Sequence, residues 1–174
     1  MAAAACAVSL AAAVSTTQAA EPSSLRAVLD AHLCDLTERL TRIHRSTDPR
    51  RTARHIVVQA EDGPDAYVQC RFLARDTRME CEAASGHHRS RAAPRPPLPR
   101  DAGALAALGF VARADGNDRR EIALEGPDSL GEVAVLMLRA LHDGYGFRAP
   151  APLLVRAPLA RLPARASSGC VPTS

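Results

Sequence analysis

The sequence contains no lysine and no tryptophan, and it has only two tyrosines and three phenylalanines among 174 residues. All 22 basic residues are therefore arginine, and alanine is the main contributor to a hydrophobic fraction of 47%. Arginine, alanine and proline in place of lysine, isoleucine and asparagine is typical of the coding bias of a GC-rich genome. The abundance of arginine is thus not by itself a sign of nucleic-acid binding, and few aromatic rings are present to stack on bases.

Motifs that mark common enzyme classes are also missing. The chain has no G-x-S-x-G, no P-loop, no H-E-x-x-H and no G-x-G-x-x-G after a strand pattern. A catalytic pair of Cys34 with His32 or His55 has no identifiable third group to orient the histidine. We therefore expect a non-enzymatic protein without a cofactor.

The cysteines are odd in number and form no C-x-x-C: Cys6, Cys34, Cys70, Cys81 and Cys170. This pattern favours neither a disulfide framework nor a zinc finger. The adjacent histidines His87 and His88 lack a neighbouring acid or second cysteine at ligand spacing, so no metal site is expected. Reduced thiols in a cytoplasmic protein are the expected state.

The two ends of the chain differ from its middle. Residues 1–20 are rich in alanine but carry no cation before Arg26, which argues against the positive n-region of a secretory signal, the alternative interpretation. This stretch is also too short and too weakly apolar to span a bilayer. Beyond Arg148, five prolines occur without any acidic residue. We expect a disordered leader at 1–22, a folded domain at 23–150 and a disordered tail at 151–174.

The net charge of +3 is distributed unevenly. The middle of the chain is neutral, and the basic excess lies in the final 27 residues. Within the middle, residues 39–55 carry a charge of +5 and residues 115–132 carry −4. These segments predict either a polarised surface that steers a charged partner or a second copy, or two faces that are solvated or neutralise each other.

The first half of the domain predicts one helix and three strands. Ser23 and Ser24 can cap a helix whose apolar residues follow at helical spacing until Asp48-Pro49 prevents its continuation. Strands are predicted at 55–60, 66–74 and 77–84 because β-branched or alternating residues are bounded by turn residues.

The last two of these strands also predict a register. Pairing Phe72 with Met79, Cys70 with Cys81 and Val68 with Ala83 places apolar residues on one face and Arg71 opposite Glu80 on the other. A shift by one residue would turn every side chain of one strand over. The pairing would place the Cys70 and Cys81 α-carbons within disulfide distance, but two buried free thiols are the preferred interpretation.

The second half adds two helices and a strand. An exposed loop rich in proline and arginine covers 85–100, a short helix covers 101–108 and ends at Gly109, and a strand covers 119–124. Ser129 and Glu132 can form a capping box for a final helix that ends at Gly144 and Gly146. The order α-β-β-β-α-β-α predicts an α+β fold, a mainly antiparallel sheet with helices at both ends of the chain.

Several local patterns of the second half recur together in one bacterial family. They are Leu98, the helix end Leu105–Phe110, the strand residues Arg119-Arg120-Glu121, and the final helix Val135–Phe147 with its Gly144-Tyr145-Gly146 end. In this order the chain resembles a family of peptide-binding chaperones related to type III secretion chaperones and YbjN-like proteins, over about residues 25–155. It departs from the family in having Phe110 where tryptophan is common and an enlarged loop at 87–100. The resemblance implies a type III secretion chaperone-like fold and a non-enzymatic role in binding peptides or partner proteins, often as a dimer.

We therefore expect a chaperone-like or adaptor domain that binds a protein or peptide client, with a homodimer as a further expectation. Apolar contacts or addition of a strand to a sheet edge would bind the client, and the arginine cluster would steer it. The candidate contact residues are Tyr67, Phe72, Leu98, Arg50, Arg51 and Arg54. The alternative is an arginine-mediated binder of nucleic acid or another anionic surface, which would require a basic face on the folded part.

Overall fold

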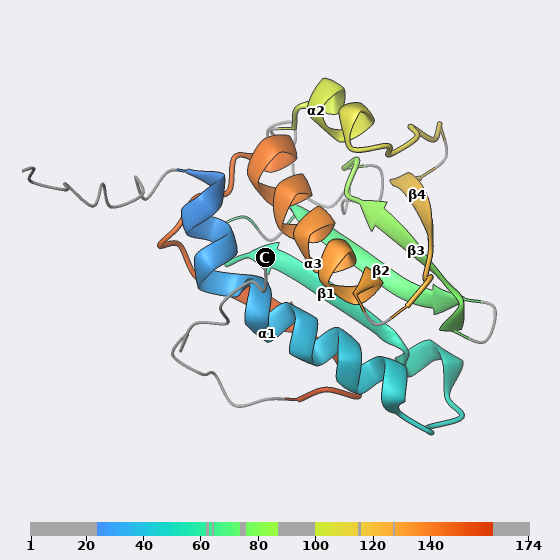
Figure 1. Ribbon diagram of the computed structural model, residues 1–174. Coiled ribbons are helices and arrows are strands. Elements are labelled where there is room, and N and C mark those ends of the chain that lie inside the picture. The colour runs from blue at the N-terminus through green and yellow to red at the C-terminus, as the bar shows by residue number, and fades with distance from the viewer. Residues whose placement is uncertain are drawn as a thin grey trace, which may run out of the picture.

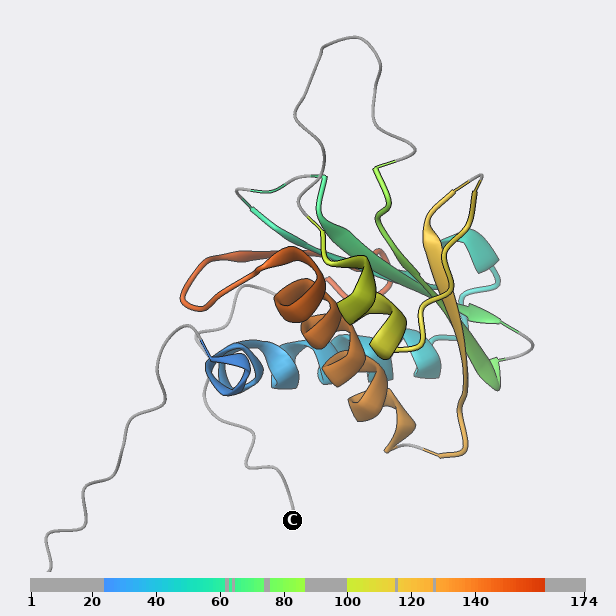
Figure 2. The same ribbon diagram turned by 90° about the horizontal axis from the view of Figure 1, so that it is seen from above.

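A computed structural model describes residues 24–61, 63, 65–73, 76–86, 100–114, 116–126 and 128–161. The predicted leader, the loop at 87–99 with Leu98, His87 and His88, and residues 162–174 lie outside the described residues. The fold is α+β, with two long helices, α1 and α3, lying side by side over one face of an antiparallel sheet (Figures 1 and 2). None of the described helices is both long enough and apolar enough to cross a membrane.

Helix α1 spans Leu25–Arg45 and confirms the predicted cap and stripe. The Ser24 hydroxyl accepts a hydrogen bond from the Ala27 N–H at 3.2 Å, which satisfies one of the free donors of the first turn. Val28, Leu36, Leu40 and Ile43 are fully buried against the sheet and α3. The helix ends three residues before the predicted stop at Asp48-Pro49.

The next three strands confirm the predicted positions and register. β1 spans His55–Ala60, β2 spans Tyr67–Leu73 and β3 spans Arg78–Ala83, after a short 3₁₀ turn, η1, at Arg51–Ala53. Cys70 faces Cys81 and Phe72 faces Met79 in the antiparallel β2–β3 pair. Asp76, in the connecting loop, adopts a positive φ of 67°, a conformation that aspartate tolerates better than most residues.

Helix α2 spans Ala102–Ala107 and strand β4 spans Asp118–Ala123. The Asp101 carboxylate caps α2 by accepting a hydrogen bond from Ala104 N–H at 2.9 Å. Gly109 ends the helix with a φ of +81°, as the sequence predicted. The Arg120 guanidinium donates a hydrogen bond to the Leu108 carbonyl and so holds the end of α2 to β4.

Helix α3 spans Ser129–Arg139 and continues as a π-helical turn, η3, at Ala140–Gly144. The predicted capping box is wrong, because Ser129 is the first helical residue and not the cap. Its hydroxyl instead accepts a hydrogen bond from Glu125 N–H at 3.1 Å, which stabilises the connection that enters the helix. Gly146, with a φ of +74°, ends the element.

A fifth strand, β5, spans Leu153–Arg156 and pairs antiparallel with β1. The prediction of a disordered tail from residue 151 is therefore wrong for these residues. The sheet order is β4-β3-β2-β1-β5, so β4 and β5 form its two edges. After β5 the chain passes under α1, where the Ala160 carbonyl accepts a hydrogen bond from Arg39 Nη1 at 2.9 Å.

Cys70 and Cys81 lie in the core, fully buried beneath the helices, and form a disulfide with α-carbons 4.0 Å apart. The preferred interpretation of two free thiols is therefore wrong, although the pairing that brought them together is right. The cross-link joins the two central strands at directly opposite positions, where neighbouring β-carbons are close enough for a disulfide.

Candidate functional site

The two edges of the sheet differ in how they are covered and in the residues that carry their open main-chain groups. In an antiparallel pair, alternate residues direct their N–H and C=O groups toward the neighbouring strand. Glu61 N–H donates to the Pro152 carbonyl at 3.2 Å, so Leu154 and Arg156 bond to β1 while Leu153 and Val155 direct both groups away from the sheet. Within the described residues, no hydrogen bond reaches these outward groups.

The β4 edge is partly covered. Leu124 N–H donates to the Thr77 carbonyl, so Arg119, Glu121 and Ala123 are the residues with outward main-chain groups. Val111 exchanges two hydrogen bonds with Arg119, at 2.8 and 2.9 Å, and closes the edge at that point. The remaining open positions belong to a strand that is strongly charged.

Exposed apolar side chains lie at both edges. Among the described large hydrophobic residues, Val111 is 65% exposed beside β4 and Leu154 is 39% exposed on β5. Single exposed apolar residues are common on proteins, but an apolar residue at an open edge offers contact area to an added strand.

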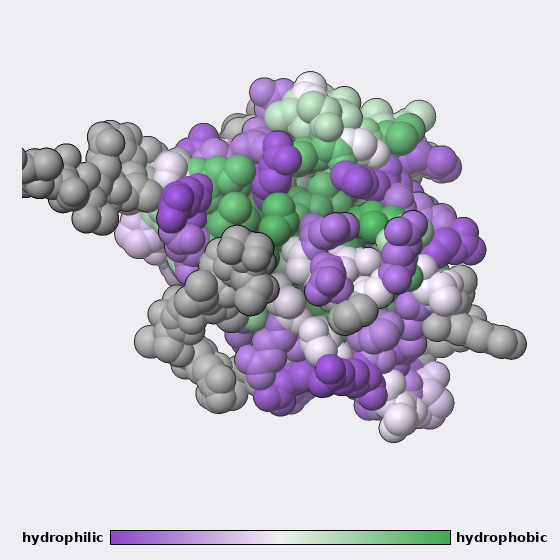
Figure 3. All heavy atoms as spheres, in the orientation of Figure 1, coloured by the Kyte–Doolittle hydropathy of each residue, from purple (hydrophilic) through white to green (hydrophobic). Residues whose placement is uncertain are grey.

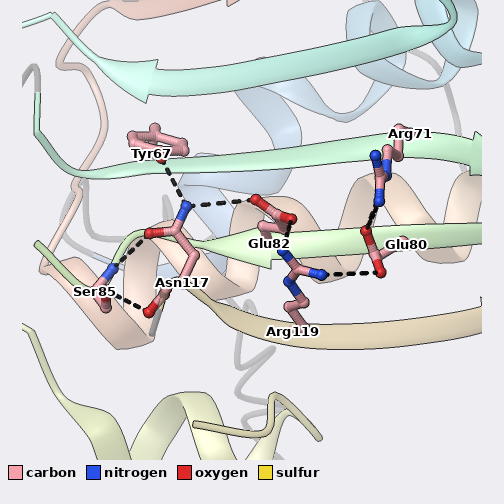
Figure 4. Close-up of polar contacts among 8 residues, drawn as sticks. Tyr67, Arg71, Glu80, Glu82, Ser85, Asn117 and Arg119 are labelled. Atoms are coloured by element: carbon pink, nitrogen blue, oxygen red, sulfur yellow. Dashed lines mark hydrogen bonds and ion pairs between the residues drawn. The ribbon is translucent and has the colours of Figure 1, made fainter. Parts of the chain in front are cut away.

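The sheet face opposite the helices carries a row of ion pairs (Figure 4). Glu80 binds Arg71 at 2.6 Å and Arg119 at 3.7 Å, and Arg119 also binds Glu82 at 3.1 Å. These charges compensate one another across β2, β3 and β4. This face is therefore polar but close to electrically neutral.

A second polar group lies at the end of the same face (Figure 4). The buried Asn117 side chain donates to the Tyr67 hydroxyl at 2.8 Å and accepts from Ser85 N–H at 3.2 Å. Tyr67 is thus engaged in fixing the connection before β4.

A hollow of about 680 Å³ opens where the α1–β1 connection passes the ends of β1 and β2. Phe72, Leu73 and Pro49 contribute its apolar lining, and His55 and Arg71 contribute polar groups. A concave site with an apolar lining and a few polar groups is a common form of binding site.

Arg54 closes one side of this hollow and is itself mostly buried. Its guanidinium binds Asp76 at 2.5 Å and donates to the carbonyls of Ser46 and His44 at 2.6 and 3.2 Å. The cation also lies over the Phe72 ring at 5.7 Å. Arg54 therefore joins the end of α1 to the β2–β3 loop, and little of its charge faces solvent.

Arg50 is exposed but paired. It binds the Asp48 carboxylate at 2.5 Å, and its hydrogen bonds hold the pKa of Asp48 at about 2, below the ordinary value. Two further arginines of the +5 segment are also engaged: Arg39 binds Asp35 at 2.7 Å and Arg42 binds Glu38 at 2.8 Å. Most of the predicted basic surface is thus neutralised locally.

The helical side of the molecule carries a strip of hydrophobic residues between the first half of α1 and α3 (Figure 3). Leu29 and Leu33, in the first half of α1, are partly buried and pack against the core. A smaller hollow of about 570 Å³ lies at the other end of α1, next to Leu124 and Leu130.

The predicted contact residues do not form one surface. Phe72 and Arg54 meet at the 680 Å³ hollow, whereas Tyr67 lies on the opposite face of β2 and at its other end. Arg50 lies on the connection beside the hollow, only the backbone of Arg51 is described, and Leu98 is outside the described residues. The open edge at β5 was missed, although its short apolar run after Pro152 fits an edge strand, where proline is tolerated.

The members of the cysteine–histidine pair considered in the sequence, Cys34 and His55, have structural contacts. Cys34 is disulfide-bonded and so is not a thiol nucleophile, and His55 Nδ1 bonds to the Thr52 carbonyl at 2.8 Å. Within the described residues, no three histidine, cysteine or acidic side chains come together as a metal site.

The residues that carry the family resemblance hold the second half of the fold together. The Tyr145 hydroxyl donates to the Ala84 carbonyl at 2.6 Å, and burial raises the pKa of Tyr145. The Gly144 carbonyl accepts from Asp101 N–H at 2.7 Å, where α2 packs closely on the end of η3. These contacts give the glycine and the tyrosine at this helix end structural roles.

The chain matches a protein-family model over most of its length. Residues 30–158 match the family model TY-Chap3, described as T3SS (YopN, CesT) and YbjN peptide-binding chaperone 3. No curated protein and no solved structure shows significant similarity to the chain. Because the match covers most of the chain and includes β5, the protein belongs to the TY-Chap3 family of peptide-binding chaperones.

Proposed function

We propose that the protein is a non-enzymatic chaperone or adaptor that binds an extended segment of a partner protein. The family match over residues 30–158 is the observation that carries this proposal. Open sheet edges support it, because an extended peptide can add to an edge through main-chain hydrogen bonds while its side chains give specificity.

The hollow beside Phe72 and Leu73 is a second candidate contact. It would accept an apolar side chain of the client, with Arg71 and His55 available to polar neighbours. Of the residues predicted from the sequence, Phe72 fits this contact best. Arg54 would support it indirectly by holding Asp76 and the end of α1.

A displayed library of random peptides, panned against the full chain, tests the proposal. We expect enriched sequences with alternating apolar residues that bind in solution with one peptide per chain, measured by isothermal titration calorimetry. Leu73→Glu should weaken peptides that use the hollow, whereas Ala107→Glu, an exposed site on α2, should not. If no enriched peptide binds in solution, the chaperone proposal fails.

Binding of nucleic acid through arginines has less support. Arg39, Arg42, Arg50 and Arg54 each have a carboxylate partner, so the basic face that nucleic-acid binding needs is largely compensated. Retention on a heparin column that declines steeply with salt would restore this alternative.

We also propose a cytoplasmic location and a homodimer. Fractionation of source cells tests the first and sedimentation of the purified chain tests the second. Sedimentation as a monomer at every concentration used for peptide binding would contradict the homodimer.

A further inference from the structure

The edge strand β5 leaves the main-chain groups of two apolar residues open. Leu153 and Val155 direct their N–H and C=O groups outward, and no described residue bonds to them. On β4, by contrast, Val111 already occupies the outward groups of Arg119. Proteins usually guard such edges with charges, bulges or covering segments.

Three successive residues of β5, Leu153, Leu154 and Val155, are apolar, so both faces of the strand carry apolar side chains. Leu153 and Val155 face the helices and are partly buried against the core, whereas Leu154 faces the other side and is 39% exposed. A strand added here would place alternate side chains beside Leu153 and Val155, where they would extend the apolar layer. Its other side chains would lie beside Leu154 and Arg156.

The charge around β5 is basic at one end. Arg156 ends the strand and Arg161 follows it, and neither has a carboxylate partner among the described residues. The exposed Glu61 lies at the opposite end, where its N–H bonds to the Pro152 carbonyl. An acidic residue of a client strand is therefore favoured beside Arg156 and not beside Pro152.

From this edge and this charge, we propose that β5 is the docking edge for an acidic, extended client segment. The client adds to β5 as an antiparallel strand, the direction of every named strand pair in the described sheet, with apolar residues on the helix side and a carboxylate beside Arg156. The inference rests on the proposed function and specifies the edge, the strand direction and the residue pattern of the client.

A fluorescein-labelled octapeptide of alternating valine and glutamate is the probe. Fluorescence anisotropy with the full chain should show tighter binding of this peptide than of the octapeptide with arginine in place of glutamate. In an antiparallel pair, the residues that bond to Leu153 and Val155 are those on the same face, the valines. N-methylation of the valines should abolish binding, whereas N-methylation of the glutamates should preserve it; any other pattern overturns the proposed arrangement.

Two exchanges of arginine for glutamate compare the edge with a distant site. Arg156→Glu should weaken binding of the acidic probe by about tenfold, because an attractive pair becomes repulsive. Arg45→Glu, at the end of α1, changes the net charge equally and should have less than about a twofold effect. Equal effects of both variants would overturn recognition by Arg156.

Hydrogen exchange locates the bound peptide. The amides of Leu153 and Val155 should become protected when the acidic probe binds, and those of Glu121 and Ala123 should not. Protection at Glu121 and Ala123 alone would overturn docking on β5 but leave the chaperone function intact. If neither octapeptide nor any library peptide binds, the proposed function itself fails.

Discussion

Position 144 requires glycine because a neighbouring side chain leaves no space for a β-carbon, and not because of the backbone angles there. A β-carbon at this position would lie 2.6 Å from Leu105 Cδ2 and 2.9 Å from its Cγ, and Leu105 is fully buried in α2. Gly144→Ala should lower the free energy of unfolding by about 1–3 kcal/mol, because α2 must move away from η3. Gly131→Ala, where a β-carbon would contact nothing within 4 Å, should instead raise it by up to about 1 kcal/mol. Urea unfolding checks both values, and equal effects would contradict the packing explanation.

The partly buried side chain of His32 lowers the free energy of unfolding. Its Nε2 atom is buried without a hydrogen-bond partner in the described structure, and its ring lies 5.8 Å from that of Phe147. Burial lowers the pKa of His32, an effect that the nearby Asp35 charge partly opposes. The protonated form is thus favoured in the unfolded chain, so stability is complete above the unfolded pKa of about 6.5 and falls as the pH drops below it.

Replacing His32 with leucine should remove both effects. The leucine keeps an apolar contact to Phe147 and leaves no polar atom unsatisfied, so the free energy of unfolding should rise by about 1 kcal/mol at pH 7.5. The gain should be larger at pH 5, where the wild-type histidine is driven toward its charged form. Urea unfolding at the two pH values measures this difference, and an equal gain at both would argue against titration of His32.

At the scale of elements, Arg54 connects a helix end to a loop between two strands. Its guanidinium reaches Asp76 and, at the end of α1, the carbonyls of His44 and Ser46 at once, with a side chain only 10% exposed. Lysine cannot reproduce this planar set of donors, so Arg54→Lys should cost about 2–4 kcal/mol in the free energy of unfolding.

Arg50→Lys is the matched control for this prediction. The Arg50 pair with Asp48 involves a side chain that is 71% exposed, and exposed pairs contribute little. We expect a change below about 0.5 kcal/mol in urea unfolding. A comparable loss in both variants would mean that Arg54 acts as an ordinary surface charge.

The elements themselves were predictable where periodicity and pairing agree. The register of β2 and β3 followed from separating Phe72, Cys70 and Val68 from the polar face, and one ion pair, Arg71 with Glu80, confirmed it. β5 was missed because a strand of four residues flanked by prolines gives too little alternation to outweigh a composition typical of tails. Its position depends on pairing with β1, roughly a hundred residues earlier, and no local pattern encodes such a contact.

The candidate site was less predictable than the fold. Phe72 was identified from its apolar character, but the sequence could not show that Arg54 would turn inward to Asp76. Nor could it show that Arg39 would be buried beneath Ala160. The charge of a sequence segment was therefore a poor guide to the charge of the surface. Arg54 binds Asp76, and Arg39 binds the Ala160 carbonyl, through contacts that only the tertiary fold creates.

At the scale of the whole molecule, β5 and the segment after it decide where the domain ends. The β5 residues cover the edge of β1, Ala157 and Ala160 are buried, and the Ala160 carbonyl binds the buried Arg39. A chain that ends at Pro152 would expose the β1 edge and leave Arg39 with one fewer partner. Relative to a chain that ends at Arg161, it should lose at least about 3 kcal/mol in the free energy of unfolding.

Both shortened chains lack residues 162–174, so their comparison isolates residues 153–161. Urea unfolding measures the stability, and light scattering measures aggregation, which we expect to increase for the shorter chain because the exposed β1 edge can pair with other molecules. Equal stability of the two chains would show that β5 adds nothing to the fold and would return the domain boundary to residue 150. A loss confined to the shorter chain would instead show that β5 is an integral strand of the domain at this edge of the sheet, because its pairing with β1 would then contribute to the stability of the fold.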